Sequence, residues 1–209
     1  MNERIIHSDA CVAEGAAWLC AADARFAKAM AGLPSLPLRL KPDGFAELLS
    51  AIVSQQVSVA SANAIWGRLQ AAGTTEAAIV AQTSEEELRA LGLSRQKARY
   101  ARALAEADID YDALHHMPAG DVIKTLTAVP GIGAWTAEIY AMFSLGRADV
   151  FAPGDLALQE AAKLIFDLDE RPKEKDFRIM AQAWSPWQSV AARIMWAYYK
   201  EHKQREGIR

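Results

Sequence analysis

Two loops of this 209-residue chain place a proline–glycine pair just ahead of a helical pattern, and each loop could do chemistry. In the sequence VPGIG, Gly131 and Gly133 can adopt backbone angles that other residues avoid, and they let another backbone approach closely. The amides that follow such a turn point outward at the positive end of the next helix, which forms an anion site. An ordinary connection between two helices, with the glycines as caps, fits the same residues.

The second loop ends in PGDL and contributes a carboxylate, Asp155. The start of a helix keeps a carboxylate ionised, and an ionised carboxylate can stabilise a developing positive charge or orient a water molecule. An aspartate directly before a helix is also a good N-cap, and many such residues have no other role. Asp149, in RADVF, is the other carboxylate nearby, and its setting indicates a structural or solvent-facing role.

Aromatic side chains are numerous for a chain of this size: Trp135, Trp184, Trp187, Trp196, Tyr140, Tyr198 and Tyr199. Tryptophans at helical spacing mostly belong to the core. The segment SRQKARYAR holds four cations within eight residues, namely Arg95, Lys97, Arg99 and Arg102. This cluster is either a solvated helix face or a local binding site for an anion.

Composition excludes several classes of protein. Two cysteines, Cys11 and Cys20, are fewer than the four that an iron–sulfur cluster requires. The four histidines lack metal-ligand spacing: His7, His115, His116 and His202. No apolar run approaches the roughly 20 residues of a membrane span, and the N-terminus does not resemble a secretory signal. We therefore expect a cytoplasmic protein that does not enter a membrane, and nothing in the sequence points to oligomers, which favours a monomer. The net charge of −3 argues mildly against nucleic acid, so any DNA contact must rest on local features.

Helical periodicity runs through most of the chain. Apolar residues from Phe45 onward recur every 3.6 residues and predict a buried helix, and a second helix, roughly 58–71, follows the polar interruption SQQVS. Further helices are predicted in 9–31 (two short ones), 83–91, 94–107, 118–129, 134–145, 153–166, 174–184 and 185–202. Thr83 or Ser84 can cap the helix over 83–91, and Glu86 or Glu87 can complete a capping box. The proline-rich segment 33–44 is extended and no strand is predicted, so the fold class is all-α with about ten helices.

The residues around VPGIG carry a resemblance to a known family. LTAVPGIGAWTA, inside the hairpin region of about 121–144, resembles the helix–hairpin–helix element of the HhH-GPD superfamily of DNA glycosylases. Four more segments resemble that family in the same order: GFAELLSAIVSQQVSVASANAI, LRALGLSRQKARYARALAEA, ADVFAPGDLALQEA and WSPWQSVAARIMW. Together the segments cover most of residues 45–200 and are most similar to the alkylpurine branch, 3-methyladenine DNA glycosylase II.

The resemblance implies roles for both loops. Gly131, Gly133 and Thr136 would bind one phosphate of double-stranded DNA. A Na⁺ or K⁺ ion would lie against that phosphate, held by the backbone carbonyls of Thr127, Val129 and Ile132. The family's essential aspartate falls on Asp155, which lies 22 residues after Gly133. No cofactor is required and no iron–sulfur cluster is expected.

Position 135 predicts the type of reaction. Relatives that also nick the DNA strand have a lysine there as an amine nucleophile, whereas this chain has Trp135, which cannot act in that way. A monofunctional enzyme that uses water and leaves an abasic site is therefore expected. The resemblance favours Trp135 and Trp196 as walls of the base pocket, together with Tyr140, while Trp184 and Trp187 are expected to be structural. An indole face attracts a cationic ring such as that of an alkylated purine.

The turn SQQVS is the place where the family inserts a wedge into the DNA gap left by a flipped base. Gln56 is the predicted wedge with Gln55 beside it, although relatives often have an apolar residue there, and both glutamines could instead satisfy turn amides. We expect two helical lobes with an active-site cleft between them, 45–148 and 1–44 plus 149–209. The predicted function is excision of alkylated bases, of the 3-methyladenine and 7-methylguanine type, in base excision repair. A non-catalytic DNA-binding module and a glycosylase for deaminated or oxidised bases are the alternatives.

Overall fold

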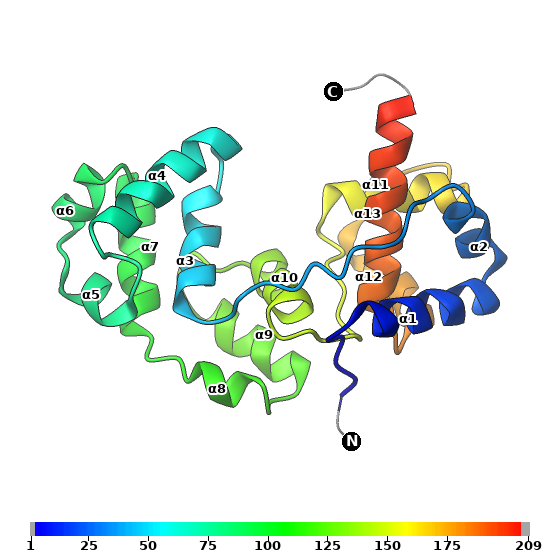
Figure 1. Cartoon of the computed structure of the whole chain (residues 1–209), viewed down its shortest axis with the longest axis horizontal. Coiled ribbons are helices and arrows are strands. Elements are labelled where there is room, and N and C mark those ends of the chain that lie inside the picture. Colours follow the sequence, from blue (N-terminus) through cyan, green and yellow to red (C-terminus); the bar gives the residue numbers. More distant parts are fainter. Residues whose placement is uncertain (1–2, 206–209) are drawn as a thin grey trace. The chain divides into compact units, whose positions relative to one another are not determined.

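The computed structural model describes residues 3–205, and helices dominate this part of the chain (Figure 1). The described residues contain no strand, and their only β-type pairing is an isolated antiparallel bridge between Ile5 and Arg147. The predicted all-α class is confirmed. The chain divides into two compact units, and it passes from one to the other after Leu40 and again after Tyr140. The predicted lobes cover similar segments with boundaries a few residues later, and those boundaries and the cleft stay predictions.

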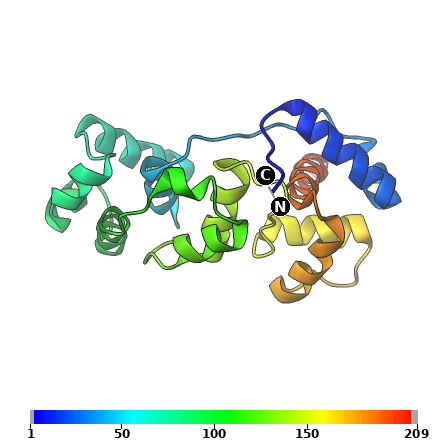
Figure 2. The same cartoon turned by 90° about the horizontal axis from the view of Figure 1, so that it is seen from below.

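Unit 1 combines the described residues up to Leu40 with those from Ala141 onward. It holds α1 (Asp9–Ala22), α2 (Ala24–Met30), α11 (Leu156–Phe166), α12 (Glu174–Ala181), the short 3₁₀ helix η1 (Gln182–Trp184) and α13 (Gln188–Arg205). Helix α13 packs along α11 and α1 (Figures 1 and 2). Trp184 is buried in the core of this unit, where it stacks on Phe166 and meets three other aromatic rings edge-on, those of Phe26, Phe151 and Phe177. Trp187 is also buried, so both tryptophans are structural, as predicted.

Unit 2 runs from Lys41 to Tyr140. Its helices are α3 (Phe45–Ser54), α4 (Val59–Ala71), α5 (Ala77–Gln82), α6 (Glu85–Ala90), α7 (Arg95–Glu106), α8 (Tyr111–Leu114) and α9 (Ala119–Thr127). Helix α10 (Ala134–Phe143) begins in this unit and ends in unit 1. The apolar face predicted for α3 is buried, and this helix packs against α7 and α4. The small residues Ala98 and Ala101 are fully buried on α7, which allows close helix packing.

Helix ends differ from the sequence prediction in a few places. The helix predicted over 153–166 begins only at Leu156, because Asp155 caps it, and the one predicted over 185–202 begins at Gln188. The predicted helix 174–184 ends at Ala181 and tightens into η1. The capping box is present with Ser84 as the cap and Glu87 as its partner. Two short helices, α5 and α8, were not predicted.

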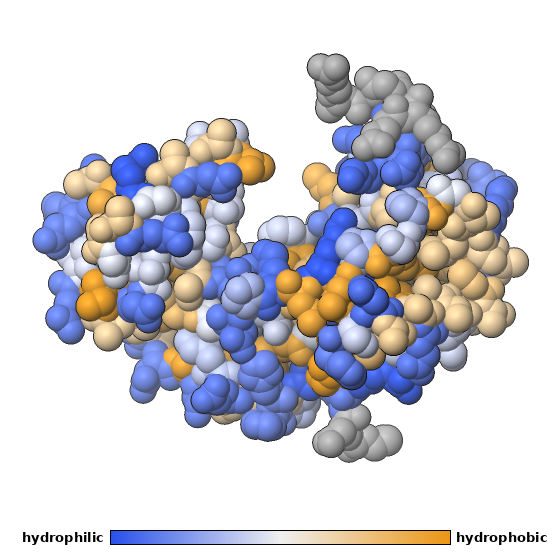
Figure 3. Space-filling model, in the orientation of Figure 1, coloured by the Kyte–Doolittle hydropathy of each residue, from blue (hydrophilic) through white to orange (hydrophobic). Residues whose placement is uncertain are grey.

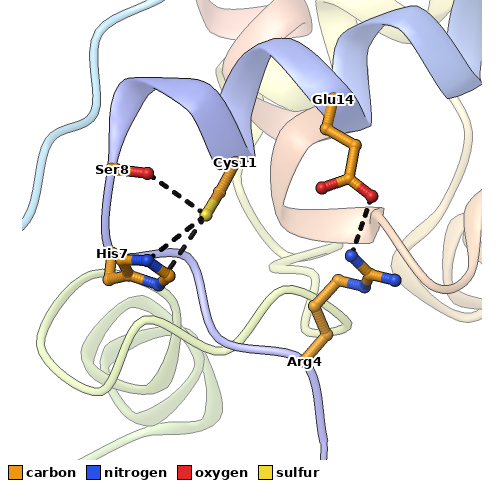
Figure 4. A network of polar contacts seen from close by, with 5 residues as sticks. All are labelled: Arg4, His7, Ser8, Cys11 and Glu14. Carbon is orange, nitrogen blue, oxygen red and sulfur yellow. Dashed lines mark hydrogen bonds and ion pairs between the residues drawn. The ribbon is translucent and has the colours of Figure 1, made fainter.

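The segment ahead of α1 is fastened to that helix by side-chain contacts (Figure 4). Arg4 Nη1 lies 2.9 Å from Glu14 Oε1. The Cys11 thiol sits 3.3 Å from Ser8 Oγ and 3.7 Å from His7 Nδ1. Hydrogen bonds with the His7 backbone and the Ser8 side chain lower the pKa of this thiol. These contacts fix the start of α1. Within residues 3–205, no group of three or more His, Cys, Asp or Glu residues is arranged to hold a metal ion.

None of the helices within residues 3–205 is both long and apolar enough to cross a bilayer. On the face seen in Figure 3, hydrophilic residues are interspersed with hydrophobic ones in both units. The broad pale orange area at the right lies over α1 and α2, whose sequences are rich in alanine.

Candidate functional site

The hairpin between α9 and α10 depends on its first glycine. Gly131 has φ +95°, a conformation that side chains with a Cβ rarely adopt, and a Cβ there would overlap the ring of Tyr100. Around Gly133 a Cβ would meet only open space. Gly131 is therefore required by the turn, whereas Gly133 leaves the start of α10 open to an approaching group.

Backbone groups around the hairpin match the predicted anion site. The N–H groups of Gly133 and Ala134 donate to no acceptor within residues 3–205. The first N–H groups of a helix have no partners inside that helix, and the helix dipole makes its start positive. The third predicted phosphate ligand, Thr136, is buried on the first turn of α10. Its backbone N–H belongs to that first turn.

Gln55 braces this hairpin from the turn between α3 and α4. Its Nε2 donates to the carbonyl oxygen of Gly131 at 2.9 Å. Nearby, Lys97 Nζ donates to the carbonyl of Val53 at 2.7 Å, and partial burial lowers the pKa of this lysine. A surface cavity of about 380 Å³ opens here, with Gln56 and the hairpin among its lining. Gln55 therefore has a structural role in holding the hairpin, so of the two predicted wedge residues only Gln56 has a side chain not used in that way.

The α3–α4 turn presents Gln56 at its tip. This residue is exposed and has φ +55°, which is uncommon for a residue other than glycine. Val59, at the start of α4, is 77% exposed. The turn therefore leaves both a glutamine and a β-branched side chain exposed to solvent. The wedge role of Gln56 stays a prediction.

The four cations predicted on one segment have different partners. Lys97 binds the Val53 carbonyl, and Arg102 binds both Glu106 at 2.8 Å and the carbonyl of Thr83 at 3.3 Å. Arg99 lies 4.0 Å from Glu85. Only Arg95 is exposed without an ion pair among the described residues. Three of the four cations of this segment therefore have partners within the protein, and Arg95 is the one whose charge is not paired among the described residues.

Asp155 accepts hydrogen bonds from two different helices of unit 1. Its Oδ1 accepts the backbone N–H of Leu158 at 3.0 Å, which is the N-cap bond of α11. The same oxygen lies 3.2 Å from Trp196 Nε1, an indole N–H donor on α13. Leu156, the next residue, is 62% exposed, so the cap is at the surface of the unit. The carboxylate is thus held by at least two donors on different elements, and Asp155 itself is partly exposed.

The aromatic residues predicted for the base pocket lie in different settings. Trp196 is half-buried, with its ring centroid 5.7 Å from that of Phe143. Trp135 is 47% exposed on the first turn of α10. Tyr140 is only 3% exposed, and its hydroxyl accepts the N–H of Gly44 at 2.8 Å. Burial raises the pKa of Tyr140 to about 12. Tyr140 thus packs as a core residue of unit 2, and its role in the pocket stays a prediction.

Asp149, the other carboxylate, is fully engaged in structure. It accepts Ser185 Oγ at 2.6 Å and Gln188 Nε2 at 2.9 Å, and these bonds fix the entry into α13. This placement agrees with the structural role predicted for it.

Comparison with known proteins identifies the family. Residues 49–189 match the model of the HhH-GPD superfamily base excision DNA repair proteins. That match covers more than half of the chain. The chain belongs to the HhH-GPD superfamily.

Solved structures of HhH-GPD proteins agree. The crystal structure of a DNA-3-methyladenine glycosidase from Bacillus halodurans superimposes with a TM-score of 0.83 at 33% identity, covering 98% of this chain and 95% of that one. The 3-methyladenine DNA glycosylase of Schizosaccharomyces pombe, in complex with abasic DNA, gives a TM-score of 0.74 at 25% identity, with coverages of 88% and 95%. DNA-3-methyladenine glycosylase 2 of Escherichia coli is 30% identical over 79% of this chain and 61% of its own length. Across the curated relatives that it matches, the chain spans 32% to 78% of their lengths.

Several residues of this HhH-GPD site were not assigned from the sequence. The brace from Gln55 and the support from Lys97 depend on partners 76 and 44 positions away. Tyr100, whose ring packs on Gly131, had no distinguishing signal beyond being an aromatic residue on an amphipathic helix.

Proposed function

We propose that the chain is a DNA glycosylase that hydrolyses the N-glycosidic bond of alkylated bases in duplex DNA, of the 3-methyladenine and 7-methylguanine type. The observation that carries the proposal is the doubly held carboxylate of Asp155, a partly exposed residue, in an HhH-GPD fold. The names of the matched relatives from Bacillus halodurans, Schizosaccharomyces pombe and Escherichia coli support the choice of alkylated bases.

The chemistry requires little more than this carboxylate. As the bond between C1′ and the base nitrogen breaks, its electron pair leaves with the base, and the sugar becomes an oxocarbenium-like cation. The Asp155 carboxylate stabilises that cation, or it orients a water molecule that adds to C1′ and releases its proton to the carboxylate or solvent. An alkylated purine is already cationic and leaves readily, so it needs no general acid.

Trp135 makes the reaction monofunctional in this proposal. An indole has no amine that could attack C1′ and form a Schiff base, so water is the nucleophile and the DNA strand stays intact. The check is a strand-break assay on the product: the abasic site should be cut only after added alkali. Strand breaks without alkali would contradict the assignment.

The hairpin would bind a DNA phosphate through the amides at the start of α10. The carbonyls of Thr127 and Ile132 accept no hydrogen bond in residues 3–205, and Val129 accepts only the N–H of Ile132 at 3.1 Å. Such hard carbonyl oxygens fit a monovalent cation, so these three residues would hold Na⁺ or K⁺ beside the phosphate. The ion would supply positive charge for phosphate binding and would take no part in bond cleavage.

The central experiment replaces Asp155 with asparagine. Asparagine keeps the size and can still cap α11, but it removes the negative charge. We expect duplex binding to persist while single-turnover release of 7-methylguanine falls by at least about 100-fold. Asp169→Asn, an exposed residue of unit 1, is the matched control and should be wild-type. Release at the wild-type rate by Asp155→Asn would show that Asp155 is not the catalytic carboxylate, whereas duplex binding without any base release by the wild-type protein would favour a non-catalytic DNA-binding module.

A second experiment fixes the substrate class. Methylated DNA, uracil-containing duplex and 8-oxoguanine duplex are each incubated with the protein, and the free bases are identified. We expect release of methylated purines. Release of uracil or 8-oxoguanine alone would instead favour a glycosylase for deaminated or oxidised bases.

A further inference from the structure

The extended segment before α3 carries an anchored pair of residues in unit 1, Leu38 and Arg39. The Leu38 carbonyl accepts two hydrogen bonds from Arg193 of α13, at 2.9 Å from Nη2 and 3.3 Å from Nε. Arg193 is only 1% exposed, and its Nη1 donates to the carbonyl of Ser189 at 3.0 Å. Because Arg193 is held from both sides, the backbone at Leu38 is fixed against α13.

Arg39 follows in an unusual conformation. Its φ is +54°, in the left-handed region, which costs a residue with a Cβ on the order of 1 kcal/mol. Its guanidinium carbon lies 6.0 Å from the ring centroid of Trp196. Trp196 is the residue whose indole N–H is bonded to Asp155. The anchored backbone therefore brings Arg39 to the residue that contacts the candidate catalytic carboxylate.

No carboxylate of the described residues neutralises the charge of Arg39. Four other exposed arginines of unit 1 each have a carboxylate within 3.3 Å, namely Arg4, Arg25, Arg171 and Arg178. Arg39 has no carboxylate partner among the described residues, and a second guanidinium faces it. Burial, and to a smaller extent the charge of Arg39, lower the pKa of Arg193 to about 10. A strained backbone that holds one cation close to another is unfavourable in itself, and an exposed contact with the Trp196 ring offsets only part of that cost.

We propose that Arg39 binds a backbone phosphate of the DNA next to the nucleotide under repair, and that it covers the indole of Trp196 in the DNA-free protein. The inference rests on the proposed function, because it takes DNA as the ligand. A guanidinium presents a planar pair of donors that matches a phosphate. An exposed cation–π contact is worth only about 0.5–1 kcal/mol, so a phosphate displaces it and leaves the indole face to the base.

The test measures binding to a duplex with a tetrahydrofuran abasic analogue over a range of salt concentrations. Arg39→Ala should weaken binding about tenfold at low salt and reduce the slope of log K against log salt by about one. Arg39→Lys keeps a cation and should retain the slope. Arg39→Gly relieves the backbone at φ +54° but removes the guanidinium, so it should behave like Arg39→Ala.

Arg171→Ala is the matched control, since it removes the same charge from an exposed residue of unit 1. The proposal is overturned if Arg39→Ala keeps the wild-type slope, if Arg39→Gly binds like wild type, or if Arg171→Ala lowers the slope equally. Binding of the abasic analogue needs no base release. A wild-type protein that binds with the expected slope but releases no base therefore refutes the proposed function and leaves Arg39 as a phosphate contact, whereas no binding at all refutes both.

Discussion

Two helix starts in this protein follow the same dipeptide and have opposite properties. Pro130–Gly131 leads to α10 and Pro153–Gly154 leads to α11. Before α10 stands Gly133, which has no side chain to cap the helix, whereas before α11 stands Asp155, whose Oδ1 accepts the N–H of Leu158. The first start offers donors to an anion, and the second presents an anion of its own. The residue just before the helix decides whether the helix start offers free N–H donors or presents a carboxylate.

The largest expected effect separates the two roles of Asp155. Asp155→Asn and Asp155→Ala should both lower single-turnover base release by at least about 100-fold, because each removes the charge. Only Asp155→Ala should also lower the free energy of unfolding, by about 1 kcal/mol, because it removes the cap. Urea denaturation beside the kinetic assay measures both. Equal stability of the two variants would show that the cap bond contributes nothing.

The two glycines provide a second contrast. Gly131→Ala should destabilise the protein by about 1–3 kcal/mol and weaken duplex binding, because φ is +95° and the new Cβ would overlap Tyr100. At Gly154 the nearest atom to a Cβ would be Glu174 Oε2 at 3.5 Å, an ordinary contact. Gly154→Ala should therefore change stability by less than about 0.5 kcal/mol. Thermal unfolding of both variants decides whether the strain belongs to the hairpin alone.

A smaller effect distinguishes the two glutamines beside the hairpin. Gln55→Ala leaves the Gly131 carbonyl without its donor and should lower the free energy of unfolding by about 1 kcal/mol. Gln56→Ala should leave stability within about 0.5 kcal/mol of wild type, yet slow base release from duplex DNA. The reverse pattern, a stability loss for Gln56→Ala and a rate loss for Gln55→Ala, would assign the brace to Gln56 and the wedge to Gln55.

The effect that is smallest at neutral pH concerns α10, because it appears only in alkali. Burial raises the pKa of Tyr140 from 10.0 to about 12, so its contribution to stability is complete below pH 10 and is lost as the pH rises through 12. Tyr140→Phe removes this titration, and the variant should lose less stability than wild type between pH 10 and pH 12. Unfolding midpoints across that range measure it, and base release near neutral pH should stay within a few fold. An equal alkaline loss in both proteins would assign the titration to other groups.

Local patterns made much of the fold predictable. The apolar period of α3 and the capping box of α6 are properties of neighbouring residues, and both appear in the structure. Helices α5 and α8 have six and four residues, too few for a period to emerge. The cap at Asp155 was likewise predictable, because capping depends on the next three residues only.

Contacts between distant residues were not predictable. Nothing near Gln55 in the sequence indicates a bond to Gly131, and nothing near Arg39 indicates Trp196. Tyr140 shows the same limit. Nothing near it in the sequence indicates that its hydroxyl accepts the N–H of Gly44, 96 positions away.

The hydrogen bond from Gln55 to Gly131 has a consequence for the thermodynamics of binding. It joins the turn that carries Gln56 to the loop with the unpaired amides, and both belong to unit 2. Under the proposed function, the distance from the gripped phosphate to the inserted side chain is then set before DNA arrives. The conformational entropy of ordering these two loops is lost during folding and not during binding. Under the proposed function, DNA then binds to two loops whose separation is already set. A duplex that can deform to match this separation should bind best.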